Sequence, residues 1–435
     1  MKQHKFLFYA LYFFLSFGCF ALEVQNSDEN YKTYKADSRI TSFIKQSTVE
    51  VYRATPEKYV QTICNKINEL ASNDFEKAKL AHDVICVTIK YDASNFWAGT
   101  VPTQNWQNVL MTKTAVCEGY ANLFLKYCEV LKIPCKKASG YARGVGTNIL
   151  NETRFDSNHA WNIVKIEEKE YLVDCTWDSG YMSGKNAVQL YSTEYLFTKP
   201  EHFIYTHFPD DAQNQLLETP LTQEQFLDLP YFKPILFDVA QNGFENFKRI
   251  TNTKDFVDIE YSLKNERYLT FTLKKLNGKA LQAVNNTILT EEKIDSGKTV
   301  TRINFPEKGT YLVDVYYWKP GAKQGHSCAQ FIFQSESGNS VKYPKLYTSS
   351  GENVKIIEPK FSPLKTSQTY EFKVQVTNKS VVSIFMGNTA VQLENDGNGN
   401  FAGEVTIPVG ITKVSVGIAN SPMARHELIA SYSAN

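Results

Sequence analysis

The spacing of apolar residues changes once along this 435-residue chain, near Pro234. Before that point, apolar residues recur every three or four positions over long stretches, which is typical of helices. After it, short runs rich in β-branched and aromatic residues alternate with turn residues, as in TYLVDVYYW. A single layered architecture does not accommodate both patterns in series. We therefore predict an α+β domain followed by all-β domains.

The β-rich part divides into two stretches, residues 235–335 and 341–435, with the flexible sequence SESGNS between them. Each stretch holds several strand-length runs with turn signals between them, which is the pattern of a β-sandwich. Aromatic residues make up 13% of the chain, and flat rings pack well on pleated sheets. The sequence therefore predicts two β-sandwiches in tandem.

The N-terminus has the features of an export signal over residues 1–21. A basic start, MKQHK, precedes the apolar run FLFYALYFFLSFGCF, which is short for a membrane span. Small residues then favour cleavage after Ala21. An uncleaved anchor is the alternative, and lipidation at Cys19 is less favoured because Ser16 stands where a larger aliphatic residue is usual. We expect a secreted or periplasmic protein, with residues 22–45 as a linker.

Composition argues against two classes of function. The net charge is +1 and no cluster of Lys and Arg occurs, which excludes an electrostatic site for nucleic acid. Of the eight cysteines, only Cys19 lies in the signal, and the remaining seven are spaced irregularly. Because no CxxC pair occurs among them, we expect no structural zinc site, and nothing in the sequence implies a cofactor.

The helical part, residues 46–230, contains the stretch KTAVCEGYANLFLKYC, which has a cysteine at its front edge. Helical spacing aligns one face, formed by Cys117, Tyr120, Ala121, Phe124, Cys128 and Leu131. Cys117 is then either a small buried residue or a thiol whose pKa the helix N-terminus lowers. Activation would also require a histidine, and the histidine would require an acceptor that fixes its tautomer.

A predicted hairpin supplies both of these groups. His159 opens the run HAWNIVKI, and Asp174 is the single acid inside the next run, YLVDCTW. A turn centred on Glu167–Glu168 makes His159 a diagonal neighbour of Asp174, whereas a turn one residue later places it opposite Asp178. Both registers put the histidine and the two acids on one face, so spacing leaves the choice of acid open. Residues 181–230 are expected to mix short helices and loops.

The blocks VCEGYANLF, HAWN and YLVDCTWDSG resemble the transglutaminase-like superfamily of papain-type thiol enzymes. More narrowly, residues 46–230 resemble the kyphoscoliosis-peptidase branch, whose members commonly carry immunoglobulin-like modules after the catalytic domain. The resemblance implies that Cys117 is the nucleophile, His159 the base and Asp174 the orienting acid.

Members of the superfamily often stabilise the oxyanion with an upstream Gln or Trp. The candidates for this role are Gln104, Gln107 and Trp106. The backbone N–H of Cys117 is a further donor.

The expected function is that of a thiol enzyme that cleaves peptide or amide bonds through an acyl-enzyme. Two alternatives remain open: protein crosslinking, in which an amine takes the acyl group, and a non-catalytic binding or scaffold protein on the same fold. The expected substrate is a protein or peptide. We expect the sandwiches to hold a cell-surface or cell-wall partner.

Overall fold

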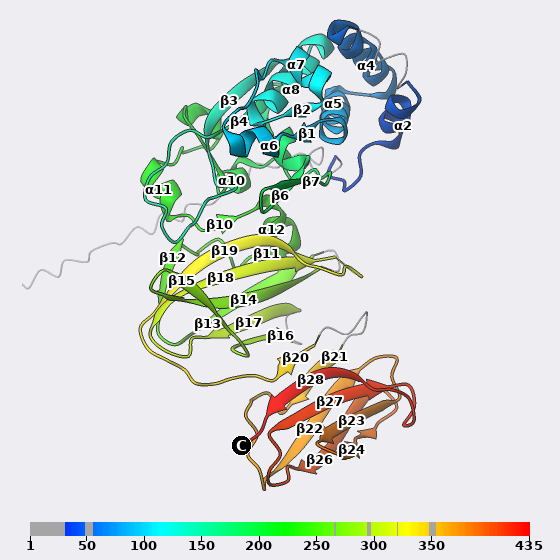
Figure 1. Ribbon diagram of the computed structural model, residues 1–435, viewed down its shortest axis with the longest axis vertical. Helices are drawn as coiled ribbons and strands as arrows, with labels where there is room; N and C mark the ends of the chain where they lie inside the picture. The colour runs from blue at the N-terminus through cyan, green and yellow to red at the C-terminus, as the bar shows by residue number, and fades with distance from the viewer. Residues whose placement is uncertain (1–30, 48–54, 265–266, 294–296, 320, 348–353) are drawn as a thin grey trace, which may run out of the picture.

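The computed structural model describes residues 31–47, 55–264, 267–293, 297–319, 321–347 and 354–435. Three parts follow one another along the long axis: a mixed domain of helices and a sheet, then two β-sandwiches (Figure 1). The predicted fold class is confirmed. The predicted signal, residues 1–21, lies outside the described residues. Among the described helices, none combines the length and the apolar character that crossing a membrane requires.

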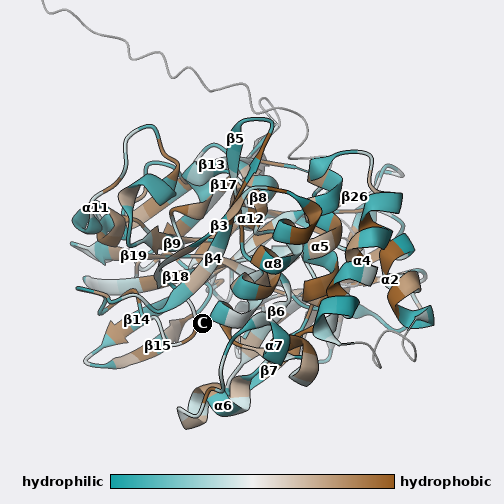
Figure 2. Cartoon of the chain, turned by 90° about the horizontal axis from the view of Figure 1, so that it is seen from above, coloured by the Kyte–Doolittle hydropathy of each residue, from teal (hydrophilic) through white to brown (hydrophobic). Residues whose placement is uncertain are grey.

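The first domain begins with helices whose start signals are visible in the sequence. Pro56 occupies the first turn of α4, and the side chain of Asn73 accepts a hydrogen bond from Glu76 N at 2.9 Å to cap α5. Figure 2 shows that α2 and α4 carry both hydrophilic and hydrophobic residues. The helices of this part are α2 (Ser38–Gln46), α4 (Pro56–Leu70), α5 (Asp74–Thr88), α6 (Ala93–Ala98), α7 (Trp106–Thr112) and α8 (Cys117–Leu131).

Helix α2 corrects the predicted linker, because it occupies the end of residues 22–45. Its Ile40 is fully buried, and Phe43 and Ile44 pack against the same core as α4 and α5. The three apolar positions are spaced three and four apart, so they lie on one face of the helix. This part of the segment therefore belongs to the first domain.

An antiparallel sheet in the order β8-β5-β4-β3-β9 backs these helices, and α8 packs against β3 and β4. The side-chain amide of Asn162, on β4, donates to the carbonyl of Ala121 at 3.1 Å and so fixes the strand against the helix. The strands are β3 (Cys135–Ala142), β4 (His159–Ile166), β5 (Lys169–Val173), β8 (Leu196–Thr198) and β9 (His207–Pro209). Short strands β1 (Lys90–Tyr91), β2 (Thr114–Ala115), β6 (Gly180–Ser183) and β7 (Asn186–Gln189) complete the domain.

The predicted hairpin forms in the register centred on Glu167–Glu168. Ile166 pairs with Lys169 and Asn162 with Val173, and both turn glutamates have positive φ, as a two-residue hairpin turn requires. The run YLVDCTW is not strand throughout, because β5 ends at Val173 and α9 (Cys175–Asp178) follows.

Residues 181–230 contain more strand than expected, since β6 to β9 all include residues of this segment. Strands β8 and β9 form the two edges of the sheet. Edge strands as short as three residues carry little alternation, so periodicity alone does not reveal them. The short helices here are α10 (Pro200–Phe203), η1 (Ala212–Gln215) and α11 (Gln223–Asp228).

The first sandwich packs the sheet β10-β19-β18-β14-β15, with β12 beside β19, on the sheet β11-β13-β17-β16. Its core is rich in buried phenylalanine, including Phe232, Phe305 and Phe333. Its elements are β10 (Tyr231–Phe232), α12 (Pro234–Val239), β11 (Ala240–Gln241), β12 (Ile250–Thr253), β13 (Phe256–Leu263), β14 (Tyr268–Asn277), β15 (Ala280–Val284), β16 (Ile288–Lys293), β17 (Lys298–Asn304), β18 (Gly309–Trp318) and β19 (His326–Ser335).

The second sandwich packs the sheet β20-β28-β27-β23-β24 on the sheet β21-β22-β26-β25. Valine and isoleucine dominate its core, in contrast to the aromatic core of the first sandwich. Its strands are β20 (Lys345–Leu346), β21 (Val354–Glu358), β22 (Thr369–Val376), β23 (Val381–Met386), β24 (Thr389–Gln392), β25 (Glu394–Asn395), β26 (Asn400–Thr406), β27 (Lys413–Ala419) and β28 (Glu427–Ser433).

A buried arginine holds the segment that leads from the first domain into the first sandwich. The guanidinium of Arg143 forms an ion pair with Glu152 at 2.8 Å and donates to the carbonyl oxygens of Phe226, Leu229 and Pro230. Since Pro230 immediately precedes β10, these bonds fix the chain at the point where the sandwich begins.

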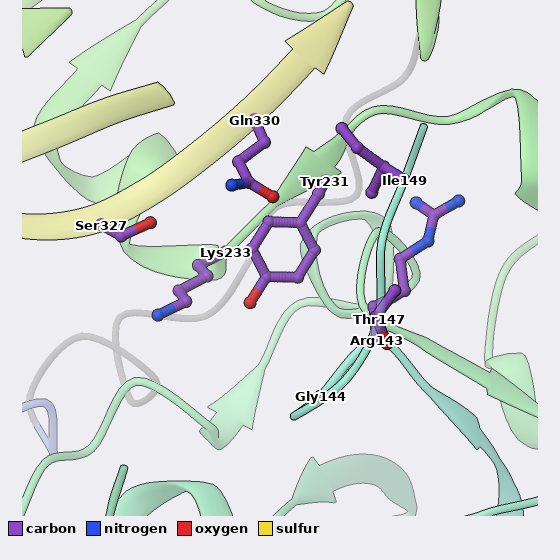
Figure 3. Close-up of a pocket in the computed structure, with 8 residues that line it drawn as sticks. All are labelled: Arg143, Gly144, Thr147, Ile149, Tyr231, Lys233, Ser327 and Gln330. Atoms are coloured by element: carbon purple, nitrogen blue, oxygen red, sulfur yellow. The ribbon is translucent and has the colours of Figure 1, made fainter. Parts of the chain in front are cut away.

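A polar cleft of about 210 Å³ lies beside this junction (Figure 3). Gly144 and Thr147 line it from the first domain, and Tyr231 and Lys233 line it from the sandwich.

Candidate active site

Cys117 is the first residue of α8 and is partly exposed. Backbone N–H groups in the first turn of a helix have no acceptor within the helix, so they present partial positive charge. The preceding residue, Val116, has no capping side chain, and its N–H donates to the side-chain oxygen of Gln104 at 2.9 Å. The sulfur therefore lies where a helix stabilises an anion.

The structure brings the three predicted site residues together. His159 is the first residue of β4, and its Nε2 lies 2.7 Å from Asp174 Oδ2. The same imidazole forms a hydrogen bond with the Cys117 thiol. Asp174 is held in turn by α9, because its Oδ1 accepts from the backbone N–H groups of Thr176 at 2.8 Å and Trp177 at 3.2 Å.

The three groups shift one another's ionisation. Burial alone would raise the pKa of the Cys117 thiol, but the hydrogen bond to His159 and the charge of His159 outweigh burial and lower that pKa. Burial opposes the charge on His159, yet Asp174 and Cys117 raise the imidazole pKa to about 10. His159 in turn holds the pKa of the Asp174 carboxyl well below its usual range despite burial. The pKa shifts of Cys117 and His159 both favour a thiolate–imidazolium pair over a neutral thiol and imidazole.

Asp178, the other acid allowed by spacing, has a different partner. Its Oδ2 lies 3.0 Å from Nε2 of His82, which is on α5, and its carboxylate accepts from Ser192 and from Tyr195 N. Burial opposes the charge on His82, but hydrogen bonds to Asp178 and Asp83 raise its pKa to about 10. Asp178 thus belongs to a buried ion-pair network that supports α9.

The candidates for oxyanion contacts separate in the structure. Gln104 is buried against the start of α8, and its Nε2 donates to Pro102 O at 2.8 Å. The ammonium of Lys126 lies over the ring of Trp106, 5.3 Å from the ring centre. Gln107 is half-buried on α7. Of the two glutamines, Gln104 is therefore the one bonded to the backbone that carries Cys117.

Two histidines at this centre carry no sequence signal that identifies them. His207 Nε2 lies 3.2 Å from Asp174 Oδ2, and His82 pairs with Asp178. His207 comes from the edge strand β9 and His82 from the middle of α5, so only long-range packing brings either one to α9.

Two groups of side chains in the described part of the chain come close enough to share a metal ion: His82 with Cys86 and Cys175, and His159 with Asp174 and His207. Hydrogen bonds account for the proximity in each group. Cys86 donates to the carbonyl of Cys175, and both imidazoles of the second group face one carboxylate oxygen. We therefore assign neither group to a metal.

Helix α8 begins at the thiol and packs on an antiparallel sheet. One strand of that sheet, β4, begins at the partner histidine. Together these features define a papain-type arrangement. Residues 61–175 match the family described as the transglutaminase-like superfamily. This segment is a transglutaminase-like domain, as its motifs predicted.

Comparison with curated proteins also confirms the predicted branch. The chain is 30% identical to kyphoscoliosis peptidase of Mus musculus over 230 residues, which are 50% of this chain and 34% of that protein. It is 29% identical to kyphoscoliosis peptidase of Homo sapiens over 213 residues, or 48% of this chain and 32% of that protein. Hillarin of Drosophila melanogaster is 27% identical over 135 residues, or 28% of this chain and 16% of that protein. The match spans about a third of the two peptidases.

Proposed function

We propose that the chain is a secreted thiol enzyme that cleaves peptide or amide bonds, with Cys117 as nucleophile, His159 as base and Asp174 as the orienting acid. One observation carries the proposal. The imidazole of His159 lies 2.7 Å from a buried carboxylate and also lowers the pKa of the thiol at the start of α8. This arrangement activates a nucleophile and returns the proton later.

The reaction follows from these contacts. The proton of Cys117 resides on His159, and the thiolate attacks the carbonyl carbon of the substrate. The backbone N–H of Cys117 donates to the resulting oxyanion in this proposal. The C–N bond then breaks as the imidazolium gives its proton to the leaving nitrogen, which leaves a thioester. Water attacks the thioester, His159 takes a proton from that water, and the acid departs as the proton returns to sulfur.

The location and partners belong to the same proposal. The export-type sequence at residues 1–21 supports secretion. The proposed partner of the two sandwiches is a cell-surface or cell-wall polymer or protein. The substrate would be a protein or peptide chain, since the predicted chemistry acts on amide carbonyls.

The test is the rate at which iodoacetamide labels each cysteine, followed by mass spectrometry at pH 7. We expect Cys117 to react fastest in the wild type. His159→Ala should slow it by about 10- to 30-fold, because an unassisted thiol is only a few per cent ionised at that pH. His326→Ala, in the first sandwich, is the matched control and should leave the rate unchanged. Equal labelling of all the thiols in the wild type would contradict the proposal.

A second assay separates the possible acyl acceptors. A glutamine-containing peptide is supplied with a fluorescent amine, and both the acid product and the amine adduct are measured. Release of acid at a rate insensitive to the amine supports hydrolysis, whereas an adduct that forms at the expense of acid supports crosslinking. Absence of both products with a reactive Cys117, over a panel of peptides, would favour the scaffold alternative.

A further inference from the structure

A second imidazole contacts the carboxylate that steers His159. His207 Nε2 lies 3.2 Å from Asp174 Oδ2, the same oxygen that His159 approaches to 2.7 Å. The other oxygen, Oδ1, accepts from the backbone N–H groups of Thr176 and Trp177. Together with the two imidazoles, four nitrogen groups therefore face the Asp174 carboxylate. We propose that His207 is a positioning residue, a neutral hydrogen-bond donor that fixes Asp174 so that His159 stays aligned with Cys117. This inference rests on the proposed function.

The partners of His207 determine its tautomer. Its Nδ1 lies 2.8 Å from the hydroxyl oxygen of Thr206. A carboxylate oxygen only accepts, so the proton of a neutral His207 must be on Nε2, which donates to Asp174. Nδ1 is then an acceptor, and the Thr206 hydroxyl, which also lies 3.2 Å from Phe203 O, donates to it over the shorter distance. Each nitrogen of the ring thus has a partner of the right kind.

The surroundings keep this imidazole uncharged. His207 is fully buried among aromatic rings, stacked on Phe203 at 4.1 Å and close to Trp177 at 4.5 Å. Burial lowers the pKa of His207 to about 4, even though Asp174 opposes that shift. A charged His207 would compete with His159 for the single negative charge of Asp174. A neutral donor orients the carboxylate and leaves its charge for His159.

Strand β3 brings the two histidines to one carboxylate. On one edge its Gly140 pairs with His159, and on the other its Ala142 pairs with His207. Positions two apart on a strand share a face, so both imidazoles lie on the side of the sheet that carries Asp174. Gly140 permits the close approach, because a Cβ there would lie 2.2 Å from the carbonyl oxygen of Phe208.

Other ionisable groups face Asp174 from the elements packed around it. They are His159 on β4, His207 on β9, Cys117 on α8, Tyr91 on β1 and Tyr195 next to β8. Burial raises the pKa of Tyr91 and of Tyr195, so both phenols stay neutral over the pH range of the test. A shift in the Cys117 titration therefore reports on the histidines and the carboxylate.

The experiment measures the pH dependence of Cys117 alkylation in a matched pair of variants. His207→Gln retains an N–H that can reach Asp174 and an oxygen for Thr206, whereas His207→Phe keeps the ring and loses the donor. We expect His207→Phe to slow alkylation at pH 7 by about five- to tenfold and to move the titration midpoint upward. His207→Gln should stay within about twofold of the wild type. The control is His202→Gln, because the ring of His202 stacks on Phe237 away from Asp174. This variant should match the wild type.

Two results would overturn the inference: a His207→Phe profile that superimposes on the wild type, or a His207→Gln variant as impaired as His207→Phe. If His207→Phe does not fold, the tautomer of His207 in the wild type tests the inference instead. Spectra of the wild type with ¹⁵N-labelled histidine should show His207 protonated on Nε2 alone from pH 5 to pH 9, and a proton on Nδ1 in that range overturns the inference. An unreactive Cys117 in the wild type would instead defeat the proposed function, since alkylation requires no substrate.

Discussion

At the scale of single residues, burial and a neighbouring charge compete to set the pKa of Cys117. Burial favours the neutral thiol, and the His159 imidazolium favours the thiolate. The reactive pair requires the thiol to be deprotonated and the imidazole to be protonated. Reactivity should therefore rise as pH passes the lowered pKa of Cys117, and the pair should be lost as pH passes the His159 pKa of about 10.

Asn substitution at each of the two acids separates their roles. Asp174→Asn removes the charge that His159 faces, so the Cys117 alkylation midpoint should move up toward that of an ordinary thiol, with at least tenfold slower labelling at pH 7. Asp178→Asn leaves the buried His82 charge poorly compensated, so it should lower the free energy of unfolding by about 3 kcal/mol and leave the midpoint near the wild-type value.

Labelling profiles and denaturant unfolding of the two variants provide the measurements. An unchanged midpoint in Asp174→Asn together with a shifted one in Asp178→Asn would reverse the assignment.

At the scale of elements, the start of α8 depends on a residue that helices ordinarily disfavour. Gly119 lies in the first turn, where the Gln104 side chain, Ala115 and Val109 press against it. A Cβ at this position would lie 2.4 Å from Gln104 Oε1 and 2.8 Å from Ala115 Cβ. The missing side chain therefore allows Gln104 to bond the N–H of Val116, just ahead of the thiol.

Gly119→Ala tests this close packing. In an open helix the change stabilises by about 0.5–1 kcal/mol, because alanine has the higher helix propensity. Here we expect overpacking to destabilise the protein by about 1–3 kcal/mol and to slow Cys117 alkylation. Urea unfolding measures the first effect and iodoacetamide labelling the second. The exposed Glu129→Ala on the same helix is the control and should stay within about 0.5 kcal/mol. A stabilised Gly119→Ala would show that Gln104 does not need this space.

At the scale of the whole molecule, polar burial holds the first domain to the first sandwich. The guanidinium of Arg143 is fully buried and bonds Glu152 together with carbonyl groups of the connecting segment. Arg249, from the sandwich side, donates to Ile149 O at 2.9 Å and Glu152 O at 2.8 Å. The bonds of Arg249 cross between the two parts, and those of Arg143 fix the segment that connects them, so we expect the parts to move together.

Arg143→Met should reveal how much this junction contributes. It leaves the buried Glu152 carboxylate without its cation, so we expect a loss of about 3–5 kcal/mol in the free energy of unfolding. Adding Glu152→Gln should recover part of that loss, because the uncompensated charge disappears. Chemical denaturation of the full chain provides the measurement.

Arg302→Met, which breaks an exposed pair with Asp258, is the comparison and should cost about 1 kcal/mol or less. A loss at Arg143 as small as this would contradict the assigned role.

Much of the fold and of the candidate site follows from local pattern. The periodicity of α8, the start signals at Pro56 and Asn73, and the two strand-rich modules are properties of short segments. The family motifs pointed to Cys117, His159 and Asp174, and the structure brings these three side chains together. Alternation also put His159 and both acids on one face, because a shift of two residues in register preserves the face.

Spacing left the choice between Asp174 and Asp178 open, and only the family motifs favoured Asp174. The tertiary structure showed that His159 faces Asp174 and what holds that carboxylate in place. The turn at Glu167–Glu168 sets the register of the hairpin, and β5 ends at Val173. Helix α9 then directs Asp178 toward His82. His207 lies on β9, a three-residue edge strand that is too short to show a periodic pattern in the sequence. Contacts between residues distant in sequence depend on the packing of the whole domain, and packing leaves no trace in the spacing of neighbouring residues.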